Sequence, residues 1–145
     1  MKEIQQDNPP LSKSLSPTNS QWSPPRQGGY KVNVNGAVFK EAGCCGIVVV
    51  IRNEGGHLME ALSKRIELPL KVLEAEAVAV QEGIPLAWDL GLKEIVIESD
   101  SQLVIFALLN SASPSWTIQK VIEGSKLSLH CFKSWTTTMF VEMGM

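Results

Sequence analysis

The alternation of apolar and polar residues begins abruptly at Tyr30. Residues 1 to about 28 are rich in Ser, Pro, Gln and Asn, and they hold too few apolar side chains to offset the entropy of ordering. From residue 30, Val32 and Val34 alternate with Lys31 and Asn33, which predicts a first strand with one apolar side. We therefore expect a tail or linker over residues 1–28 and one folded domain over residues 29–145.

Two more strands are predicted directly after the first. Cys45–Ile51 is a nearly continuous apolar run rich in β-branched residues, and the turn signal Arg52–Gly56 follows it. A third strand is expected from about His57 to Ile66. We interpret Gly43-Cys44-Cys45-Gly46 as the hairpin turn before the second strand, so the three strands form an antiparallel meander.

The second half of the chain predicts helices and strands in alternation. Val72–Leu90 has a helical period and ends at Gly91, although Pro85 predicts a kink or a local break. Further elements are expected at Glu94–Glu98 (strand), Ser99–Asn110 (helix), Trp116 to about Cys131 (helix) and Lys133–Val141 (strand). The order β-β-β-α-β-α-α-β predicts the α/β class, with a mixed five-stranded sheet flanked by helices.

Composition narrows the possible functions only a little. The formal net charge of -2 gives no global basic field, so nucleic-acid contact would depend on local groups such as Lys31, Lys40, Arg52, Lys64 and Arg65. Each of these is also explained as a solvated surface charge. The three cysteines form neither a disulfide framework nor a zinc spacing, and His57 and His130 have no zinc or triad spacing. Without a signal peptide or a run of ~18 apolar residues, we expect an intracellular, soluble protein with no membrane contact.

Two carboxylates are candidates for chemistry. Glu76 lies at the edge of the buried helical stripe, where an acidic group needs a partner or a cation, and its alternative is a solvated glutamate on an alanine-rich helix. Asp100 follows the predicted strand at Glu94–Glu98, and its alternative is a helix N-cap, a role open to Ser99 as well. Periodicity alone leaves these alternatives open.

Several stretches in order resemble one known family. They are Trp22-Ser23-Pro24-Pro25, Tyr30-Lys31-Val32-Asn33-Val34-Asn35-Gly36-Ala37, Leu73-Glu74-Ala75-Glu76-Ala77-Val78-Ala79 and Glu98-Ser99-Asp100-Ser101-Gln102-Leu103. Together they resemble the ribonuclease H-like superfamily, in particular the plant retroelement-type domains associated with reverse transcriptases. The resemblance runs from about Trp22 to Phe132.

The resemblance implies both an activity and a site. The family cleaves the RNA strand of RNA–DNA hybrids by a two-metal mechanism, in which carboxylates hold Mg²⁺ or Mn²⁺. It implies Glu76 and Asp100 as catalytic metal ligands and Asn35 as a weakened third. Gly36 and Gln102 are then expected to contact the nucleic-acid strand. No small-molecule cofactor is expected, and the domain is expected to be a monomer.

Two departures from the family pattern bear on activity. The first strand carries Asn35-Gly36-Ala37 in place of Asp-Gly-Ala, and an asparagine offers an oxygen without the negative charge. Asn-Gly is also a strong hairpin signal, which would require Tyr30–Val34 and Ala37–Lys40 to pair. The sequence given stops at residues 140–145, where the family continues into a final helix with another acidic residue, and Glu142 does not match that motif. We expect a domain that lacks this helix.

These observations leave two functional hypotheses. The leading one is an RNA–DNA hybrid ribonuclease with impaired catalysis, since two of the four expected carboxylates are present. The alternative is a catalytically inactive nucleic-acid-binding or interaction module, or a decayed retroelement fragment.

Overall fold

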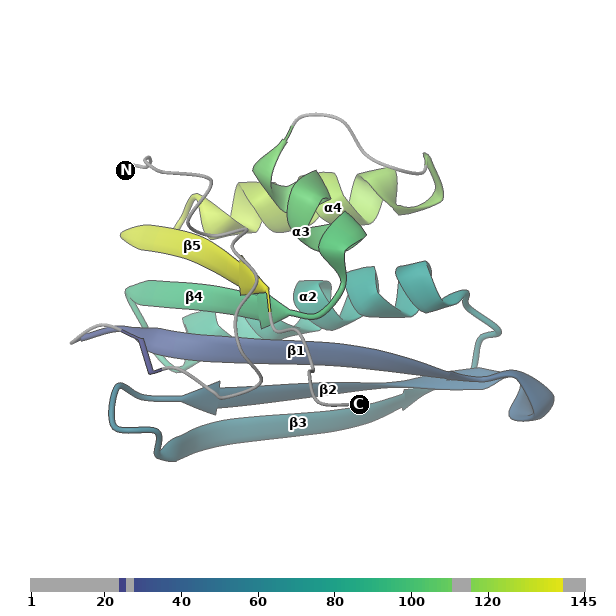
Figure 1. The fold of residues 1–145 in the computed structure, drawn as a ribbon, viewed down its shortest axis with the longest axis horizontal. Helices are drawn as coiled ribbons and strands as arrows, with labels where there is room; N and C mark the ends of the chain where they lie inside the picture. Colours follow the sequence, from purple (N-terminus) through teal and green to yellow (C-terminus); the bar gives the residue numbers. More distant parts are fainter. Residues whose placement is uncertain (1–23, 26–27, 111–115, 140–145) are drawn as a thin grey trace.

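A computed structural model describes residues 24–25, 28–110 and 116–139 of the chain. Figure 1 shows a twisted sheet with helices packed along it. The elements in chain order are β1 (Tyr30–Phe39), the short 3-10 helix η1 (Lys40–Ala42), β2 (Cys44–Arg52), β3 (Leu58–Ile66), α2 (Val72–Asp89), β4 (Glu94–Ser99), α3 (Gln102–Leu109), α4 (Trp116–Leu129) and β5 (Ser134–Met139). The predicted tail lies almost entirely outside the described residues, as do Phe140 and Val141 of the predicted last strand.

The sheet has five strands in the order β3-β2-β1-β4-β5. β1 pairs antiparallel with β2, and β2 pairs antiparallel with β3, as predicted for the meander. β4 lies parallel to β1 on its other side, and β5 lies parallel to β4. The prediction of a mixed five-stranded α/β sheet is therefore confirmed.

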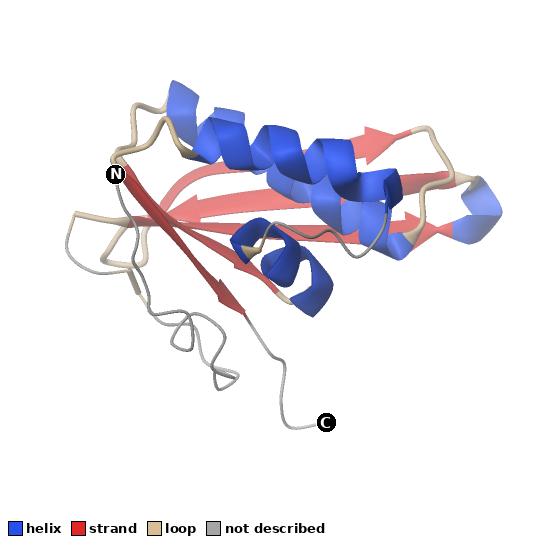
Figure 2. Cartoon of the chain, turned by 90° about the horizontal axis from the view of Figure 1, so that it is seen from above, coloured by secondary structure: helices blue, strands red, loops and turns tan. Residues whose placement is uncertain are grey.

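One face of the sheet packs against the helices. α2 contacts β1 and β2, and α4 runs beside α2 (Figures 1 and 2). Gly83 of α2 lies against the Cγ1 atoms of Val32, Val34 and Val49, so the helix approaches the strands closely. The core between these layers consists of β-branched strand residues and aliphatic helix residues, among them Ile47, Ile51, Ile97, Val80, Ile84, Val104, Leu108, Ile118 and Ile122.

The turn between β1 and β2 differs from both sequence interpretations. β1 continues through Asn35 and Gly36 to Phe39, so the Asn-Gly hairpin does not form. The chain turns at η1, and Gly43 closes the turn with a φ of 66° that favours glycine. The predicted turn over Gly43–Gly46 is wrong beyond its first residue, because Cys44 already pairs with Phe39. Pairing along both strands outweighs the local turn preference of Asn-Gly.

The helices begin and end close to the predicted residues, with two differences. α2 runs through Pro85 without an interruption, so the predicted break is wrong. Pro85 itself is exposed, while Ile84 and Ala87 on either side of it are buried in the core, and this burial offsets the lost backbone bond. α3 begins at Gln102 rather than at Ser99. Among the described residues, no helix has both the length and the apolar character needed to cross a membrane.

Gly36 is the position at which β1 and α2 approach each other most tightly. A Cβ atom at residue 36 would lie 2.7 Å from the backbone carbon and oxygen of Ala75 and 2.9 Å from the nitrogen of Glu76. These are backbone atoms, which cannot move aside as the end of a flexible side chain can. Gly36 is therefore required for the first turns of α2 to lie against β1.

We predict that Gly36→Ala destabilises the fold by about 2 kcal/mol or more, because a methyl group there forces the strand and helix apart. Urea unfolding measures the change. The control is Gly124→Ala in α4, where a Cβ meets nothing within 4 Å. The control should be neutral or stabilising by up to ~1 kcal/mol. Equal stability of the two variants would contradict this account of Gly36.

Candidate functional site

The predicted site residues lie around the end of β4. β1 and β4 pair in parallel from Tyr30 opposite Ile95 to Asn33 opposite Glu98. Asn35 and Asp100 are each two residues beyond this last pair, so both lie past the same end of the β1–β4 ladder. Asp100 follows β4 directly, at the end of a parallel strand where ligand sites of open α/β sheets lie.

Glu76 reaches this place from α2. Its side chain is buried at 7% exposure, so the alternative of a solvated glutamate is wrong. Its Oε1 accepts a hydrogen bond of 3.0 Å from the backbone N–H of Gly36. The same glycine that permits the close approach of α2 thus supplies a donor that orients the carboxyl group.

Glu76 and Asp100 interact directly. Burial, together with the negative charge of Asp100 and a side-chain hydrogen bond with it, raises the pKa of Glu76 from 4.5 to about 7. The N–H of Gly36 opposes the shift, because it stabilises the charged form. Two carboxyl groups held together in this way favour a proton or a cation between them.

Asp100 does not serve as a helix cap. Ser101 is the N-cap of α3, and its Oγ accepts from the N–H of Val104 at 3.4 Å. Ser99 Oγ accepts from the N–H of Ser101 at 3.0 Å. Since serines on both sides satisfy the start of α3, the Asp100 carboxylate remains available to the site.

The other two predicted residues lie at the edge of this arrangement. Asn35 is exposed and lies beside Gly36 on β1. Gln102 is exposed at the first position of α3. The structure therefore brings Glu76, Gly36 and Asp100 together, with Asn35 and Gln102 next to them at the surface.

A groove of roughly 270 Å³ has Asn35 among its lining residues. Ala37 and Phe39 of β1, Val48 of β2 and Arg65 of β3 also line it. It gives the candidate site an open surface on one side.

The donor set is made of oxygen atoms only, which suits Mg²⁺ or Mn²⁺. The described residues contain no group of three or more His, Cys, Asp or Glu residues close enough to hold a metal. Asn35 carries an amide at the position where the family resemblance implies a carboxylate, so the candidate set has two carboxyl groups. The residues present fit a divalent cation through two carboxylates and an amide oxygen.

Comparisons with known proteins place this arrangement in a family. A family model described as reverse transcriptase-like matches residues 33–141, which is most of the chain and includes Asn35, Glu76 and Asp100. The chain belongs to the reverse transcriptase-like family. A comparison with curated proteins found no match.

Solved structures similar to this reverse transcriptase-like domain include several ribonucleases H. RNase H1 from the halophilic archaeon Halobacterium salinarum NRC-1 has 21% identity and a TM-score of 0.72, with 79% of this chain and 86% of that chain covered. The N-terminal RNase H domain of a Mycobacterium tuberculosis protein has 16% identity and a TM-score of 0.71, over 79% and 82%. LC11-RNase H1, solved in complex with an RNA/DNA hybrid, has 16% identity and a TM-score of 0.67, over 78% and 85%. The fold is therefore ribonuclease H-like.

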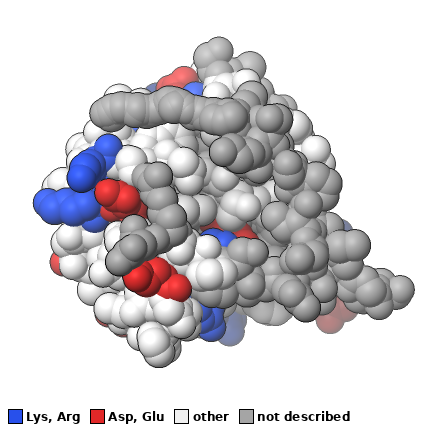
Figure 3. Space-filling view, turned by 60° about the vertical axis from the view of Figure 1, so that its left-hand side comes forward, with Lys and Arg blue, Asp and Glu red and all other residues white. Residues whose placement is uncertain are grey.

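The sequence interpretation of Lys31 needs correction in this domain, and two of the other basic residues are paired with acidic ones. Lys31 was a candidate phosphate contact, but it is buried and paired with Glu98 of β4 at 3.6 Å. Lys64 pairs with Glu82 at 3.5 Å and Arg65 with Glu67 at 2.5 Å. On the face in Figure 3, the described charges form small groups of mixed sign rather than a broad basic patch.

The contacts around Glu98 are a feature of this region that sequence reasoning missed. The alternation in β1 already places Lys31 and Asn33 on one side of the strand. Only the pairing of β1 with β4, a contact between segments about 65 residues apart, brings Glu98 opposite them. The contact of Glu98 with Lys31 and Asn33 can be inferred from the sequence only when β1 and β4 are known to be parallel neighbours.

The raised pKa of Glu76 predicts how stability depends on pH in metal-free protein. Below pH 4.5 the carboxyl group is protonated in both the folded and the unfolded state. Between pH 4.5 and about 7 only the unfolded chain releases the proton, so stability falls, by on the order of 3 kcal/mol for a shift of this size. We predict that Glu76→Gln removes this loss, since its side-chain oxygen still accepts from Gly36.

Urea unfolding in the presence of a chelator, at pH values from 4 to 8, measures this effect. The stability of Glu76→Gln relative to the original protein should rise with pH and level off above about 7. The control Glu82→Gln lies on the same helix, half-buried beside Lys64, and should show no such rise. A pH-independent difference for Glu76→Gln would contradict the raised pKa of Glu76.

Proposed function

We propose that this domain is an RNA–DNA hybrid ribonuclease of reduced activity, with its site at Glu76 and Asp100. The observation that carries the proposal is the meeting of these two carboxyl groups at Gly36, at the end of β4. The similar LC11-RNase H1 was solved with an RNA/DNA hybrid, which supports the same class of nucleic acid as the partner here. The four ordered stretches of the sequence support an origin among plant retroelement-type domains.

Glu76 and Asp100 would hold Mg²⁺ or Mn²⁺, with the amide oxygen of Asn35 as a further ligand. When bound, such a cation supplies charge stabilisation at the scissile phosphate and activates water. Other residues of the chain orient the two carboxyl groups that would hold the cation. Gly36 orients Glu76 through its N–H, and because Ser101 caps α3, the Asp100 carboxylate is not used as the helix cap. Gln102, exposed beside Asp100, contacts the nucleic-acid strand, which extends over the groove that Asn35 lines.

Asn35 explains why activity is expected to be low. It contributes a neutral oxygen where a carboxylate would balance the charge of a divalent cation. Two carboxylates bind such an ion more weakly than three, and the developing charge at the phosphate is stabilised less. Mg²⁺ and Mn²⁺ both accept carboxylate and amide oxygens as ligands, so activity is to be compared in the two ions.

A second function is favoured by the same residue. With Asn35 in place, the domain can bind a hybrid through its surface without cleaving it. This module would keep hybrid affinity in the presence of a chelator, whereas the ribonuclease needs the cation.

The test is cleavage of a labelled RNA–DNA hybrid in Mg²⁺ and in Mn²⁺. We predict slow cleavage by the original protein, none by Asp100→Asn, and a rate at least tenfold higher for Asn35→Asp, equivalent to about 1.4 kcal/mol of barrier. The control Asn53→Asp adds the same charge in the turn after β2, where the side-chain oxygen accepts from the N–H groups of Gly55 and His57 in either form. It should leave the rate unchanged.

The outcomes separate the two functions. Cleavage lost in Asp100→Asn supports the ribonuclease. Hybrid binding without cleavage by the original protein and by Asn35→Asp, both shown to be folded, supports the binding module.

A further inference from the structure

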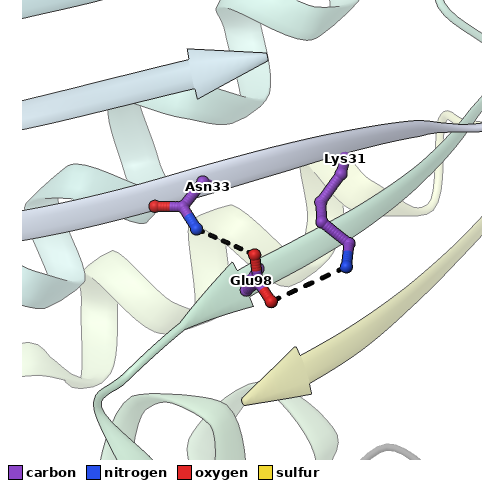
Figure 4. A network of polar contacts seen from close by, with 3 residues as sticks. All are labelled: Lys31, Asn33 and Glu98. Carbon is purple, nitrogen blue, oxygen red and sulfur yellow. Dashed lines mark hydrogen bonds and ion pairs between the residues drawn. The ribbon is translucent and has the colours of Figure 1, made fainter. Parts of the chain in front are cut away.

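A second cluster of polar side chains lies next to the candidate site. Lys31 and Asn33 of β1 both contact Glu98 of β4, as Figure 4 shows. Lys31 Nζ is 3.6 Å from Oε2, and Asn33 Nδ2 donates to Oε1 at 2.8 Å. The Lys31 and Glu98 side chains are only 6% and 3% exposed. Each oxygen of the buried carboxylate therefore has its own partner on β1. We call these three residues the strand clamp.

The strand clamp lies at the last paired step between β1 and β4. The ladder ends with Asn33 opposite Glu98. Asn35 and Asp100 are each two residues beyond this last pair. In the described part of the chain, the clamp is thus the final contact between these strands before the candidate site begins.

Stability alone does not explain a charged pair in this place. Burial lowers the pKa of Lys31, and the nearby charge of Glu98 opposes that shift. Removing two charges from water is costly, and apolar residues of similar size are often as stabilising or more so. What the clamp adds is geometry, because two directional contacts from alternate residues of β1 converge on one carboxylate and fix β4 along the strand axis.

We propose that Lys31, Asn33 and Glu98 are positioning residues that hold Asp100 in place relative to Gly36 and Asn35, and so set the spacing of the cation ligands. This inference rests on the proposed function. Asp100 is two residues beyond Glu98, so any displacement of Glu98 along β4 carries Asp100 with it. The interaction of Asp100 with Glu76, which Gly36 holds, depends on that displacement being small.

The test replaces the clamp without changing net charge. The double variant Lys31→Met with Glu98→Leu is expected to stay folded, because apolar residues of similar volume replace the ion pair. Its affinity for Mn²⁺, measured by electron paramagnetic resonance, should fall by about 10- to 100-fold, as found when residues that orient metal ligands are removed. In metal-free protein, the amide NMR resonances of Gly36 and Asp100 should shift.

The control removes an ion pair at the other end of β4, where Glu94 is the first residue of the strand. Lys133 Nζ lies 3.7 Å from Glu94 Oε2, and Lys133→Met with Glu94→Leu makes the same chemical change there. This control should keep both the Mn²⁺ affinity and the two amide resonances. A second variant, Asn33→Ala, removes one contact while both charges remain, and it decides the question if the double variant does not fold.

The results distinguish this inference from the proposed function. A folded clamp variant with unchanged Mn²⁺ affinity and unshifted amides overturns the positioning role. Absence of Mn²⁺ binding in the original protein contradicts the proposed metal site instead. In that case the amide resonances of Gly36 and Asp100 in metal-free protein still test the positioning role. Shifts in the clamp variants but not in the control support it, and unshifted resonances overturn it.

Discussion

The contact between Gly36 and the beginning of α2 is the constraint on which the candidate site depends. With hydrogen as its side chain, Gly36 lets the backbone of Ala75 and Glu76 approach β1 within a distance that no Cβ would permit. Its N–H then meets the Glu76 carboxyl group. A helix displaced outward by one methyl group would carry Glu76 away from both β1 and Asp100. The packing of α2 against β1 and the position of the Glu76 carboxyl group therefore both depend on Gly36.

The end of β4 carries two carboxylates that the fold treats in opposite ways. Glu98 is neutralised from within, since Lys31 and Asn33 occupy both of its oxygens. Asp100, two residues later, has another carboxyl group as its neighbour. A buried charge without compensation is strongly unfavourable, so the first arrangement is complete by itself and the second needs a proton or a cation from solution. The contrast supports the proposal that Asp100, and not Glu98, receives a ligand.

The order of elements was predictable because it depends on local periodicity. The alternation at Val32 and Val34 and the helical spacing after Val72 are both imposed by which side of each element packs on the core. Two predictions were wrong where a local preference competed with contacts between residues far apart in the sequence. Asn35-Gly36 favours a turn, yet pairing with β2 keeps it in a strand, and Pro85 disfavours a helix, yet the packing of its neighbours maintains one.

The residues of the candidate site were predictable from the sequence, but the way they come together in space was not. Glu76 and Asp100 stood out by resemblance, but their proximity depends on the parallel pairing of β1 with β4, which no local pattern encodes. The burial of Lys31 was missed for this reason, because an isolated lysine on a strand is usually solvated.

The neutral side chain of Asn35 changes the electrostatics of the site more than its shape. β1 keeps its course through residues 35 and 36, so an aspartate at residue 35 would lie past the same end of the β1–β4 ladder as Asp100. Three carboxylates at this point would repel one another strongly without a cation, whereas two can share a proton near neutral pH. Under the proposed function, Asn35 would therefore make the metal-free domain easier to fold and the metal-bound state harder to reach. Stability without the cation and affinity for it are opposed at this single residue, while the fold around it stays the same.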